Sequence, residues 1–325
     1  MPSFLSRLVS LIRIWSLKAA VSALLIVWRA VEPPSAHCAP TLVKTYHVRP
    51  KLRNRIHIPR AYESHRAPLP LYLNIHGGGW TLMEALDDDE FCSYIANTFN
   101  VVVVNIDYHK APRNPFPGPI NDVVAIAGAA IADEELPIDR RRIAMGGFSA
   151  GGNLALAASQ RAELHDVIQA VVSFFAPLDM ATPVSRKLET RLRSDKPDML
   201  AGILGIFNEA YMTPGTNPTN PLLSPIYAKR DALAAWLCVI GAEEDCLCLE
   251  SRDFAEKMAL SPDNEGKSES DTWERGKVKW ELMRGMAHNF THLRKRAPSA
   301  EIRRKEANVA LYGRIFAWLH SGPWS

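Results

Sequence analysis

A serine flanked by small residues is the strongest chemical signal in the sequence. Residues 147–152 read GFSAGG and stand between a short apolar run and a helical pattern. A serine on a sharp strand-to-helix turn needs small residues two positions before it and two positions after it, because larger side chains would collide there. Gly147 and Gly151 meet this requirement. The segment therefore predicts a nucleophilic Ser149, with the N-terminal N–H groups of the following helix directed at the reacting atoms.

A glycine-rich turn gives the second signal. Residues 76–80 read HGGGW and directly follow an apolar run at 69–75. Three consecutive glycines expose backbone N–H groups and let the chain approach a ligand closely. A flexible turn after a strand is the purely structural alternative. Because this turn precedes Ser149 in the same series of elements, its position favours a loop that contributes N–H groups to an oxyanion hole.

A base and an acid must accompany the serine. A serine hydroxyl is a poor nucleophile unless a nearby base removes its proton, and that base must itself be held and stabilised as a cation. Where the serine stands on such a turn, the chain order is serine, acid, histidine, each on a loop after a strand. Asp245 and His288 each follow a short apolar run and fit these positions. Glu243 or Glu244 is an alternative acid, since a small shift of the loop would bring either into place.

Other chemistries have less support from the same residues. His288 and His292 lie four positions apart and could share a helical face as metal ligands, but no third ligand motif such as HExxH accompanies them. Cys246 and Cys248 could form a redox pair, but their CxC spacing lacks a helix start. Asn289 begins a formal glycosylation sequon, which we expect to be unused. We expect no metal ion and no organic cofactor.

The composition describes an ordinary globular chain. It has 325 residues, of which 47% are hydrophobic and 22% charged, and this excludes the disordered, collagen-like and polytopic membrane classes. The net charge of +3 is too small to indicate a nucleic-acid partner. The five cysteines are scattered and lack paired CxxC spacing, so neither a disulfide framework nor a zinc site is indicated. We therefore predict an intracellular, cytoplasmic location.

The N-terminal segment differs from the rest of the chain. Residues 8–31 are strongly apolar, but Arg13, Lys18 and Arg29 interrupt them. The longest uncharged run, 19–28, is shorter than the roughly 20 apolar residues of a membrane span. The charges gather on one arc of a helical wheel, so the segment is amphipathic and basic. Three interpretations are open: a helix packed on the protein's own body, an interfacial helix in peripheral contact with a membrane, and a signal peptide or signal anchor.

Beyond this segment, apolar runs alternate with helical patterns. This alternation is typical of an α/β fold, a mostly parallel sheet with helices on both faces. Strands are expected at 55–58, 69–75, 101–106, 142–145, 168–175, 236–241 and 278–283. Helices are expected at 120–132, 151–161, 199–211, 249–258 and 299–319. The alternation breaks at 182–220, which indicates an insertion over the sheet, and the polar residues 261–277 indicate a surface loop.

These motifs together resemble the hormone-sensitive-lipase-like family of α/β-hydrolases, the HGGG and GxSxG esterases and lipases of fold-3. The matching stretches are HGGGW, GFSAGGN, DCL at 245–247, GMAHNF at 285–290, YHKAPRNPFP at 108–117 and NPLLSP at 220–225. The match runs from about residue 69 to about residue 319. The resemblance implies an α/β-hydrolase domain at 43–325. It also implies a helical cap formed by the N-terminal segment 1–42 and the insertion at 182–220.

The resemblance also implies a role for each matched site residue. Ser149 would be the nucleophile, His288 the general base and then acid, and Asp245 the group that orients His288. The implied oxyanion hole consists of the N–H groups of Gly78, Gly79 and Ala150. Its loop would be supported by His76 and Gly77. The implied function is a carboxylic ester hydrolase. The alternatives are a lyase, dehydratase or acyltransferase on the same scaffold, and a non-catalytic small-molecule receptor.

Several positions depart from the family pattern. Phe148 stands where the family usually has aspartate, and fungal members that serve secondary metabolism often carry a phenylalanine there. Cys246 replaces the usual proline after the acid, which predicts a looser turn. The resemblance implies a hydrophobic or secondary-metabolite ester as the small-molecule substrate. Candidates to size its acyl group are Met199, Leu200, Ile203, Leu204, Ile206, Phe207 and Tyr211. The structural alternative, which is the default for such an apolar stripe, is that these residues pack against the sheet.

Overall fold

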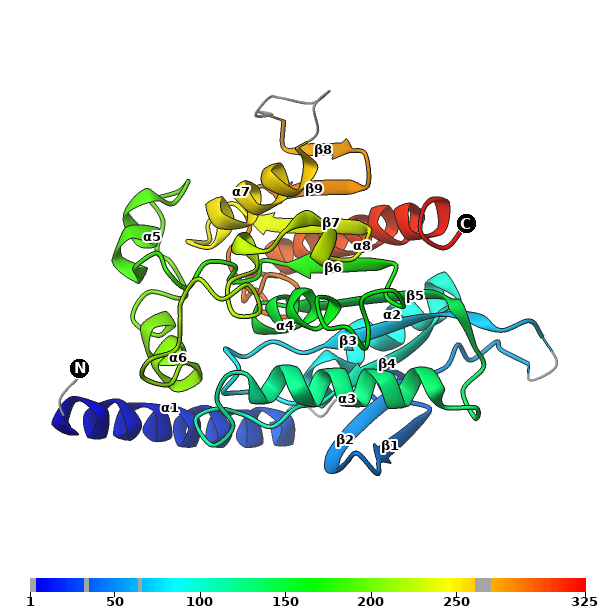
Figure 1. Ribbon diagram of the computed structural model, residues 1–325, viewed down its shortest axis with the longest axis horizontal. Coiled ribbons are helices and arrows are strands. Elements are labelled where there is room, and N and C mark those ends of the chain that lie inside the picture. Colours follow the sequence, from blue (N-terminus) through cyan, green and yellow to red (C-terminus); the bar gives the residue numbers. More distant parts are fainter. Residues whose placement is uncertain (1–3, 32–34, 64–65, 261–269) are drawn as a thin grey trace.

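A nine-stranded sheet forms the centre of the computed structural model, which describes residues 4–31, 35–63, 66–260 and 270–325. The strands are β1 (Leu42–Tyr46), β2 (Arg49–His57), β3 (Leu69–Ile75), β4 (Val102–Ile106), β5 (Ile138–Phe148), β6 (Ala170–Phe174), β7 (Trp236–Ala242), β8 (Thr272–Arg275) and β9 (Val278–Met283). Their order across the sheet is β1-β2-β4-β3-β5-β6-β7-β9-β8 (Figure 1). The strands from β4 to β9 in this order pair in parallel, whereas β1, β2 and β8 pair antiparallel at the two edges. The expected mostly parallel sheet is confirmed.

Helices cover both faces of this sheet. The α-helices of the described residues are α1 (Phe4–Val31), α2 (Asp89–Phe99), α3 (Gly118–Ala132), α4 (Ala150–Ser159), α5 (Val184–Thr190), α6 (Leu204–Tyr211), α7 (Cys248–Ala259) and α8 (Pro298–Ser321). On one face α3, α4 and α7 pack against alternate strand residues such as Leu71 and Leu73, and on the other α2 and α8 pack around residues such as Tyr72. Both faces are therefore buried, which explains the continuous apolar runs of β3 and β4.

Some elements differ from the sequence-based expectation. The strand expected at 55–58 starts earlier, at Arg49, and pairs with β1. Its first half is not predicted because Lys51 and Arg53 are charged and exposed. The loop expected at 261–277 contains β8, because Trp273 packs into the core while the strand pairs with β9. Residues 261–269 lie outside the described residues. The helix expected at 199–211 begins only at Leu204 and is preceded by turns.

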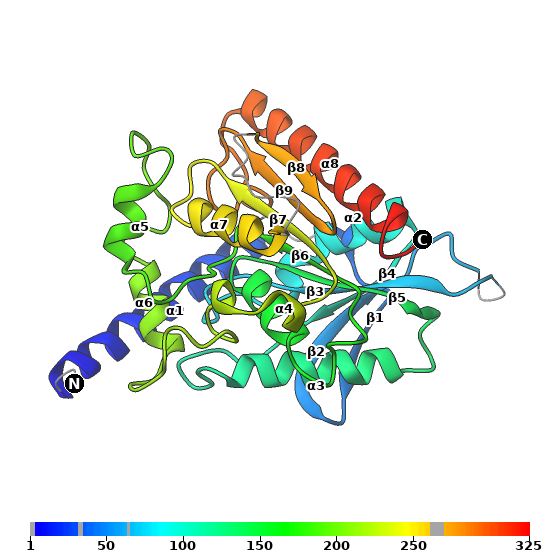
Figure 2. The ribbon, with the colours of Figure 1, turned by 45° about the horizontal axis from the view of Figure 1, so that its top comes forward.

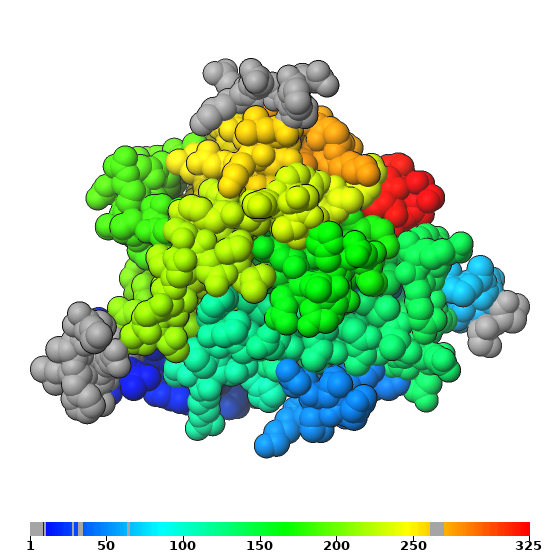
Figure 3. All heavy atoms as spheres, in the orientation of Figure 1, coloured from blue at the N-terminus to red at the C-terminus, as the bar shows by residue number. Residues whose placement is uncertain are grey.

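Three helices lie together beyond the carboxyl ends of the parallel strands: α1, α5 and α6 (Figures 1 and 2). We call α1 and the segment 182–220 the cover. Helix α1 packs along α6, and its blue atoms lie toward the lower left of the space-filling view (Figure 3). The Lys18 Nζ donates to the carbonyl oxygens of Thr81 and Ala111, at 2.6 and 3.1 Å. The Arg29 guanidinium donates to Asp87 at 2.6 Å.

Most of α1 nevertheless faces outward. Among its described side chains only Ile14 is buried. The exposed large apolar residues of this helix are Val9, Leu11, Ile12, Trp15, Leu24, Ile26, Val27 and Val31. The part Leu11–Val31 is long and apolar enough to cross a membrane by length and composition, so the expectation of too short a run is wrong by that criterion. Peripheral membrane contact and a signal anchor stay predictions.

Candidate active site

Ser149 occupies a strained turn between β5 and α4. Its backbone has φ +52° and ψ −118°, a conformation that residues with side chains rarely adopt. A Cβ atom on Gly147 would lie 2.4 Å from the Ile75 carbonyl oxygen, and one on Gly151 would lie 2.0 Å from the same atom. Positions 147 and 151 must therefore both be glycine, as the spacing around Ser149 predicts. This tight turn presents the Ser149 side chain at the carboxyl edge of the sheet.

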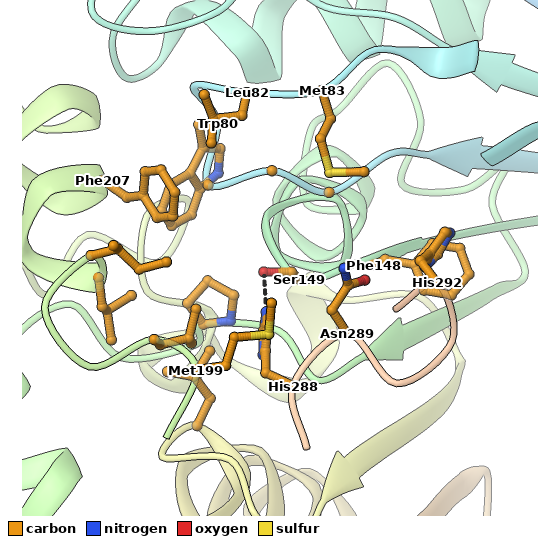
Figure 4. Close-up of a pocket in the computed structure, with 18 of the residues that line it drawn as sticks. Trp80, Leu82, Met83, Phe148, Ser149, Met199, Phe207, His288, Asn289 and His292 are labelled. Atoms are coloured by element: carbon orange, nitrogen blue, oxygen red, sulfur yellow. Dashed lines mark hydrogen bonds between the residues drawn. The ribbon is translucent and has the colours of Figure 1, made fainter. Parts of the chain in front are cut away.

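Two other loops bring a histidine and an acid to the same edge. His288 follows β9, and its Nε2 lies 3.0 Å from the Ser149 Oγ. Its Nδ1 lies 2.7 Å from the Oδ2 of Asp245, which stands between β7 and α7 and is 1% exposed. The structure thus brings Ser149, His288 and Asp245 into one hydrogen-bonded chain, part of which Figure 4 shows.

The neighbouring Glu243 has a different set of contacts. Its two carboxylate oxygens accept from the Arg284 guanidinium at 2.9 Å and from the Gly285 N–H at 2.7 Å. Burial raises the pKa of Glu243, but the hydrogen bonds from Gly285 and Arg284 outweigh it and hold the pKa below its usual value. Glu243 therefore joins the acid loop to the histidine loop, while Asp245 is the acid that contacts His288.

The glycine-rich turn lies opposite these groups. Gly78 and Gly79 have φ values of +101° and +59°, and Gly79 lies so close to α6 that a Cβ would stand 2.4 Å from the Phe207 ring. Among the residues that the structure describes, none accepts a hydrogen bond from the N–H of Gly78 or Gly79. Ala150 is the first residue of α4, where backbone N–H groups lack partners within the helix. All three N–H groups are therefore available to an acceptor.

Comparison with known proteins places this geometry in a family. A family model described as alpha/beta hydrolase fold matches residues 72–292. This chain is a member of the hormone-sensitive-lipase-like α/β-hydrolases. The match covers the glycine-rich turn, the serine, the acid and the histidine.

The α/β-hydrolase is similar to several curated and solved esterases. An arylesterase of Saccharolobus solfataricus is 30% identical over 201 residues, covering 59% of this chain and 62% of that protein. A versiconal hemiacetal acetate esterase of Aspergillus parasiticus is 34% identical over 112 residues, 34% of each chain. The chain thus spans less than two thirds of these relatives. The solved carboxylesterase EstE1 from a metagenomic library, at 23% identity, has a TM-score of 0.72 and covers 92% of this chain and 97% of its own.

In this α/β-hydrolase, His76 braces the glycine-rich turn. Its Nδ1 lies 2.8 Å from the Gly77 carbonyl oxygen, and its Nε2 lies 3.1 Å from Asp107. The ring stacks on Tyr108 at 4.4 Å, and the Tyr108 hydroxyl donates to the carbonyl oxygens of His76 and Gly77. Burial raises the pKa of Asp107, but the hydrogen bond from His76 and the charge of Lys110 outweigh it and hold that pKa well below its usual value. The loop therefore rests on a buried polar frame.

A pocket extends from Ser149 under the cover (Figure 4). Five of the seven predicted acyl-sizing residues line it, namely Met199, Leu200, Ile203, Leu204 and Phe207. Ile206 and Tyr211 instead pack into the core, where Tyr211 stacks on Trp80 at 4.3 Å. The opposite wall contains residues that sequence reasoning did not assign to the pocket: Met83, Asp88, Asn289 and His292. Met83, Asp88 and His292 lie outside the matched motifs, and Asn289 lies inside one that assigned it no role.

Two departures from the family pattern have clear structural consequences. Phe148 packs among aromatic rings, 4.6 Å from Phe174 and edge-on to His292 at 4.5 Å. The Cys246 N–H donates to the Asp198 carboxylate at 2.7 Å, a bond that a proline could not form because it lacks an N–H. The turn after the acid is therefore hydrogen-bonded to the cover, so the prediction of a looser turn is wrong.

The alternative metal and redox interpretations gain little from the geometry. The His292 Nε2 lies 3.1 Å from Asp88, whereas both ring nitrogens of His288 face Ser149 and Asp245, so the two imidazoles do not converge on one point. One group of potential ligand atoms, from Asp198, Asp245 and Cys246, lies within 4.8 Å. Both of its carboxylates already accept hydrogen bonds. Cys246 and Cys248 are free, and burial raises the pKa of both thiols.

Proposed function

We propose that this α/β-hydrolase is a carboxylic ester hydrolase that works through an acyl-enzyme on Ser149. The hydrogen-bonded chain from Ser149 through His288 to Asp245, whose Ser149 and His288 line a pocket, carries the proposal. The names of its relatives support the same class, since they include an arylesterase and an acetate esterase.

In the first half of the reaction, the Ser149 Oγ attacks the acyl carbonyl carbon. His288 takes the hydroxyl proton at Nε2, and Asp245 holds the ring through the N–H at Nδ1 and stabilises the resulting cation. His288 then gives this proton to the leaving alcohol, which breaks the ester bond and leaves the acyl group on Ser149. Both steps use groups already within hydrogen-bonding distance.

The tetrahedral intermediate carries a negative oxygen that needs donors. The free N–H groups of Gly78, Gly79 and Ala150 would bind this oxygen, and donors of this kind are worth roughly 3–4 kcal/mol each in transition-state stabilisation. In the second half of the reaction, water loses a proton to His288 and attacks the acyl-enzyme. The acid then leaves, and Ser149 recovers its proton.

The cover would select the substrate. Pro177, Leu247 and the five apolar cover residues give the wall beyond Ser149 an apolar surface, which favours a hydrophobic acyl group. We assign the cap role to α1 and residues 182–220, because α6 supplies Phe207 to the pocket and α1 packs along α6.

Hydrolysis of a p-nitrophenyl ester series, from acetate to long chains, tests the function. The wild type is compared with Ser149→Ala, and a fluorophosphonate probe reports whether Ser149 is nucleophilic. We expect Ser149→Ala to lower kcat by about 10³–10⁶-fold without loss of fold. Product analysis should find the free acid. Folded wild type that neither turns over nor reacts with the probe would refute the proposal, and acyl transfer to an alcohol instead of water would make the chain an acyltransferase.

A further inference from the structure

The pocket has two unlike arms on either side of Ser149 (Figure 4). One arm runs toward α6 and is lined by apolar side chains, which include Trp80, Ile203 and Phe207. The other arm runs past Asn289 and is lined by polar as well as apolar groups. We call the second one the Asn289 arm, and it is bounded by Met83, Asp88, Phe148, Asn289 and His292.

The Asn289 side chain has hydrogen-bonding capacity that the protein does not use. Its amide offers two donors and an acceptor, and no described residue forms a hydrogen bond with it. The backbone at Asn289 has φ +60°, and its carbonyl oxygen accepts from the N–H groups of His292 and Leu293 at 3.1 and 2.9 Å. This turn fixes the residue in place. Figure 4 shows the amide extending into the pocket beside Ser149.

A buried polar pair, Asp88 and His292, lines the same arm. The Asp88 carboxylate is 1% exposed, lies 3.1 Å from the His292 Nε2 and accepts from the Asn74 amide at 2.7 Å. The Thr291 hydroxyl lies 2.8 Å from the other His292 ring nitrogen. A polar group that enters beside Asn289 therefore finds polar side chains among apolar ones, whereas in the α6 arm the polar side-chain group is the buried indole N–H of Trp80.

The reaction geometry indicates which part of an ester enters the Asn289 arm. The leaving oxygen must lie within hydrogen-bonding distance of the His288 Nε2 to receive its proton. Figure 4 shows the Asn289 amide beside Ser149 and His288, so it stands next to the position of the leaving group. The acyl group then extends toward the apolar arm, in line with the proposed hydrophobic acyl specificity.

We propose that the Asn289 arm binds a hydroxyl or carbonyl group on the alcohol portion of the substrate. The preferred substrates are then esters of an apolar acid with an alcohol that carries a further oxygen, such as partial esters of diols and polyols. Asn289 acts as a specificity-determining residue that contacts this oxygen. The inference rests on the proposed ester hydrolysis at Ser149.

A pair of matched esters tests this inference. In 2-hydroxyethyl hexanoate and propyl hexanoate, a hydroxyl and a methyl group occupy the same position. We expect the wild type to have a kcat/KM about three- to tenfold higher for the hydroxyl ester, the effect of one neutral hydrogen bond. Asn289→Gly removes the amide while accepting the left-handed backbone. In this variant the ratio should fall to about one, with an unchanged Tm.

The matched control lies in the opposite arm. Phe207→Leu alters the apolar wall, and it should shift the preferred acyl length while keeping the hydroxyl preference. A wild-type ratio of one, or an Asn289→Gly variant that keeps the preference, would overturn the inference. If either result occurs while the enzyme still hydrolyses p-nitrophenyl butyrate, only the inference fails and the proposed function stands. Failure of the function itself would show as no turnover of any ester and no reaction of Ser149 with the fluorophosphonate.

Discussion

The catalytic edge of the sheet and the cover above it both use apolar contacts, but the cover depends in addition on single polar side chains. Ser149, Asp245 and His288 follow strands whose residues nearest the site are mostly buried, so many small apolar contacts fix their positions. The cover is attached at several points by single polar side chains. In α1 the Lys18 ammonium reaches two backbone carbonyls. In α5 the Lys187 ammonium donates to the Asp179 carbonyl oxygen at 2.5 Å and pairs with Glu250 of α7.

This difference predicts how each region responds to substitution. A conservative change of a catalytic side chain leaves the apolar contacts of its strand intact, whereas a buried ion pair leaves an unpaired charge when one partner is removed. Substitutions at the edge should therefore lower kcat without lowering the free energy of unfolding. In the cover, the substitution of one polar residue should lower the free energy of unfolding.

The largest expected effect lies at the edge, in Asp245→Asn. An asparagine can keep the contact with His288 but cannot stabilise its cation, and the equivalent change in a serine protease lowers kcat by about 10⁴-fold. We expect a loss of that order in kcat for p-nitrophenyl butyrate, with the same Tm. The control is Glu243→Gln, which should cost less than tenfold because Glu243 does not touch His288. Equal losses in both variants would refute the assignment of the acid.

The next effect concerns the cover, in Lys187→Met. This change leaves the buried Glu250 without its cation, and such a loss costs about 3–5 kcal/mol in the free energy of unfolding. Urea unfolding at pH 7 measures it. The double variant Lys187→Met/Glu250→Gln should recover most of the loss, since no unpaired charge remains. A single variant within 1 kcal/mol of wild type would mean that the cover is not held in this way.

A smaller effect should appear where the two regions touch, in Gly79→Ala. The added Cβ would collide with the Phe207 ring and would also disfavour the positive φ. We expect kcat/KM to fall about 10²-fold, because the oxyanion loop must shift. Adding Phe207→Ala removes the collision but not the backbone strain, so it should restore only part of the activity. No restoration would show that the loop and α6 act independently.

The smallest effect is a change in acid stability, in Asp107→Asn. The pKa of Asp107 lies below its usual value when the protein is folded, so the carboxylate stabilises the fold above about pH 4 and this contribution is lost as the pH falls further. The variant should be about 2 kcal/mol less stable at pH 7. The difference in the free energy of unfolding between the variant and the wild type should become smaller as the pH falls. Urea unfolding between pH 3 and pH 7 measures this difference. A constant gap would contradict the assigned protonation.

The sequence predicts the edge far better than the cover. Ser149, the glycines around it and the parallel strands all follow from local spacing and from apolar runs. The contacts of Asp198 and Lys18 could not be predicted from the sequence. Asp198 accepts from the Cys246 N–H and Lys18 donates to the Thr81 carbonyl oxygen, and such distant backbone groups leave no pattern in the sequence. Asn289 lies inside a matched motif, but the motif does not show where its side chain points. The structure shows this, through the positive φ of Asn289 and the position of its amide in the pocket. Contacts between a side chain and a distant backbone group depend on the folded arrangement alone.

Because most of the cysteines are buried, a fluorophore can be attached selectively to a cysteine introduced on α1. Cys92, Cys238, Cys246 and Cys248 are buried, and burial raises the pKa of each, so they react slowly with maleimides at neutral pH. Cys38 alone is partly exposed. Once it is replaced by serine, a cysteine introduced at an outward position of α1 becomes the single site for an environment-sensitive fluorophore. The emission colour of that fluorophore in water, and again with lipid vesicles, would report directly on the surroundings of the helix.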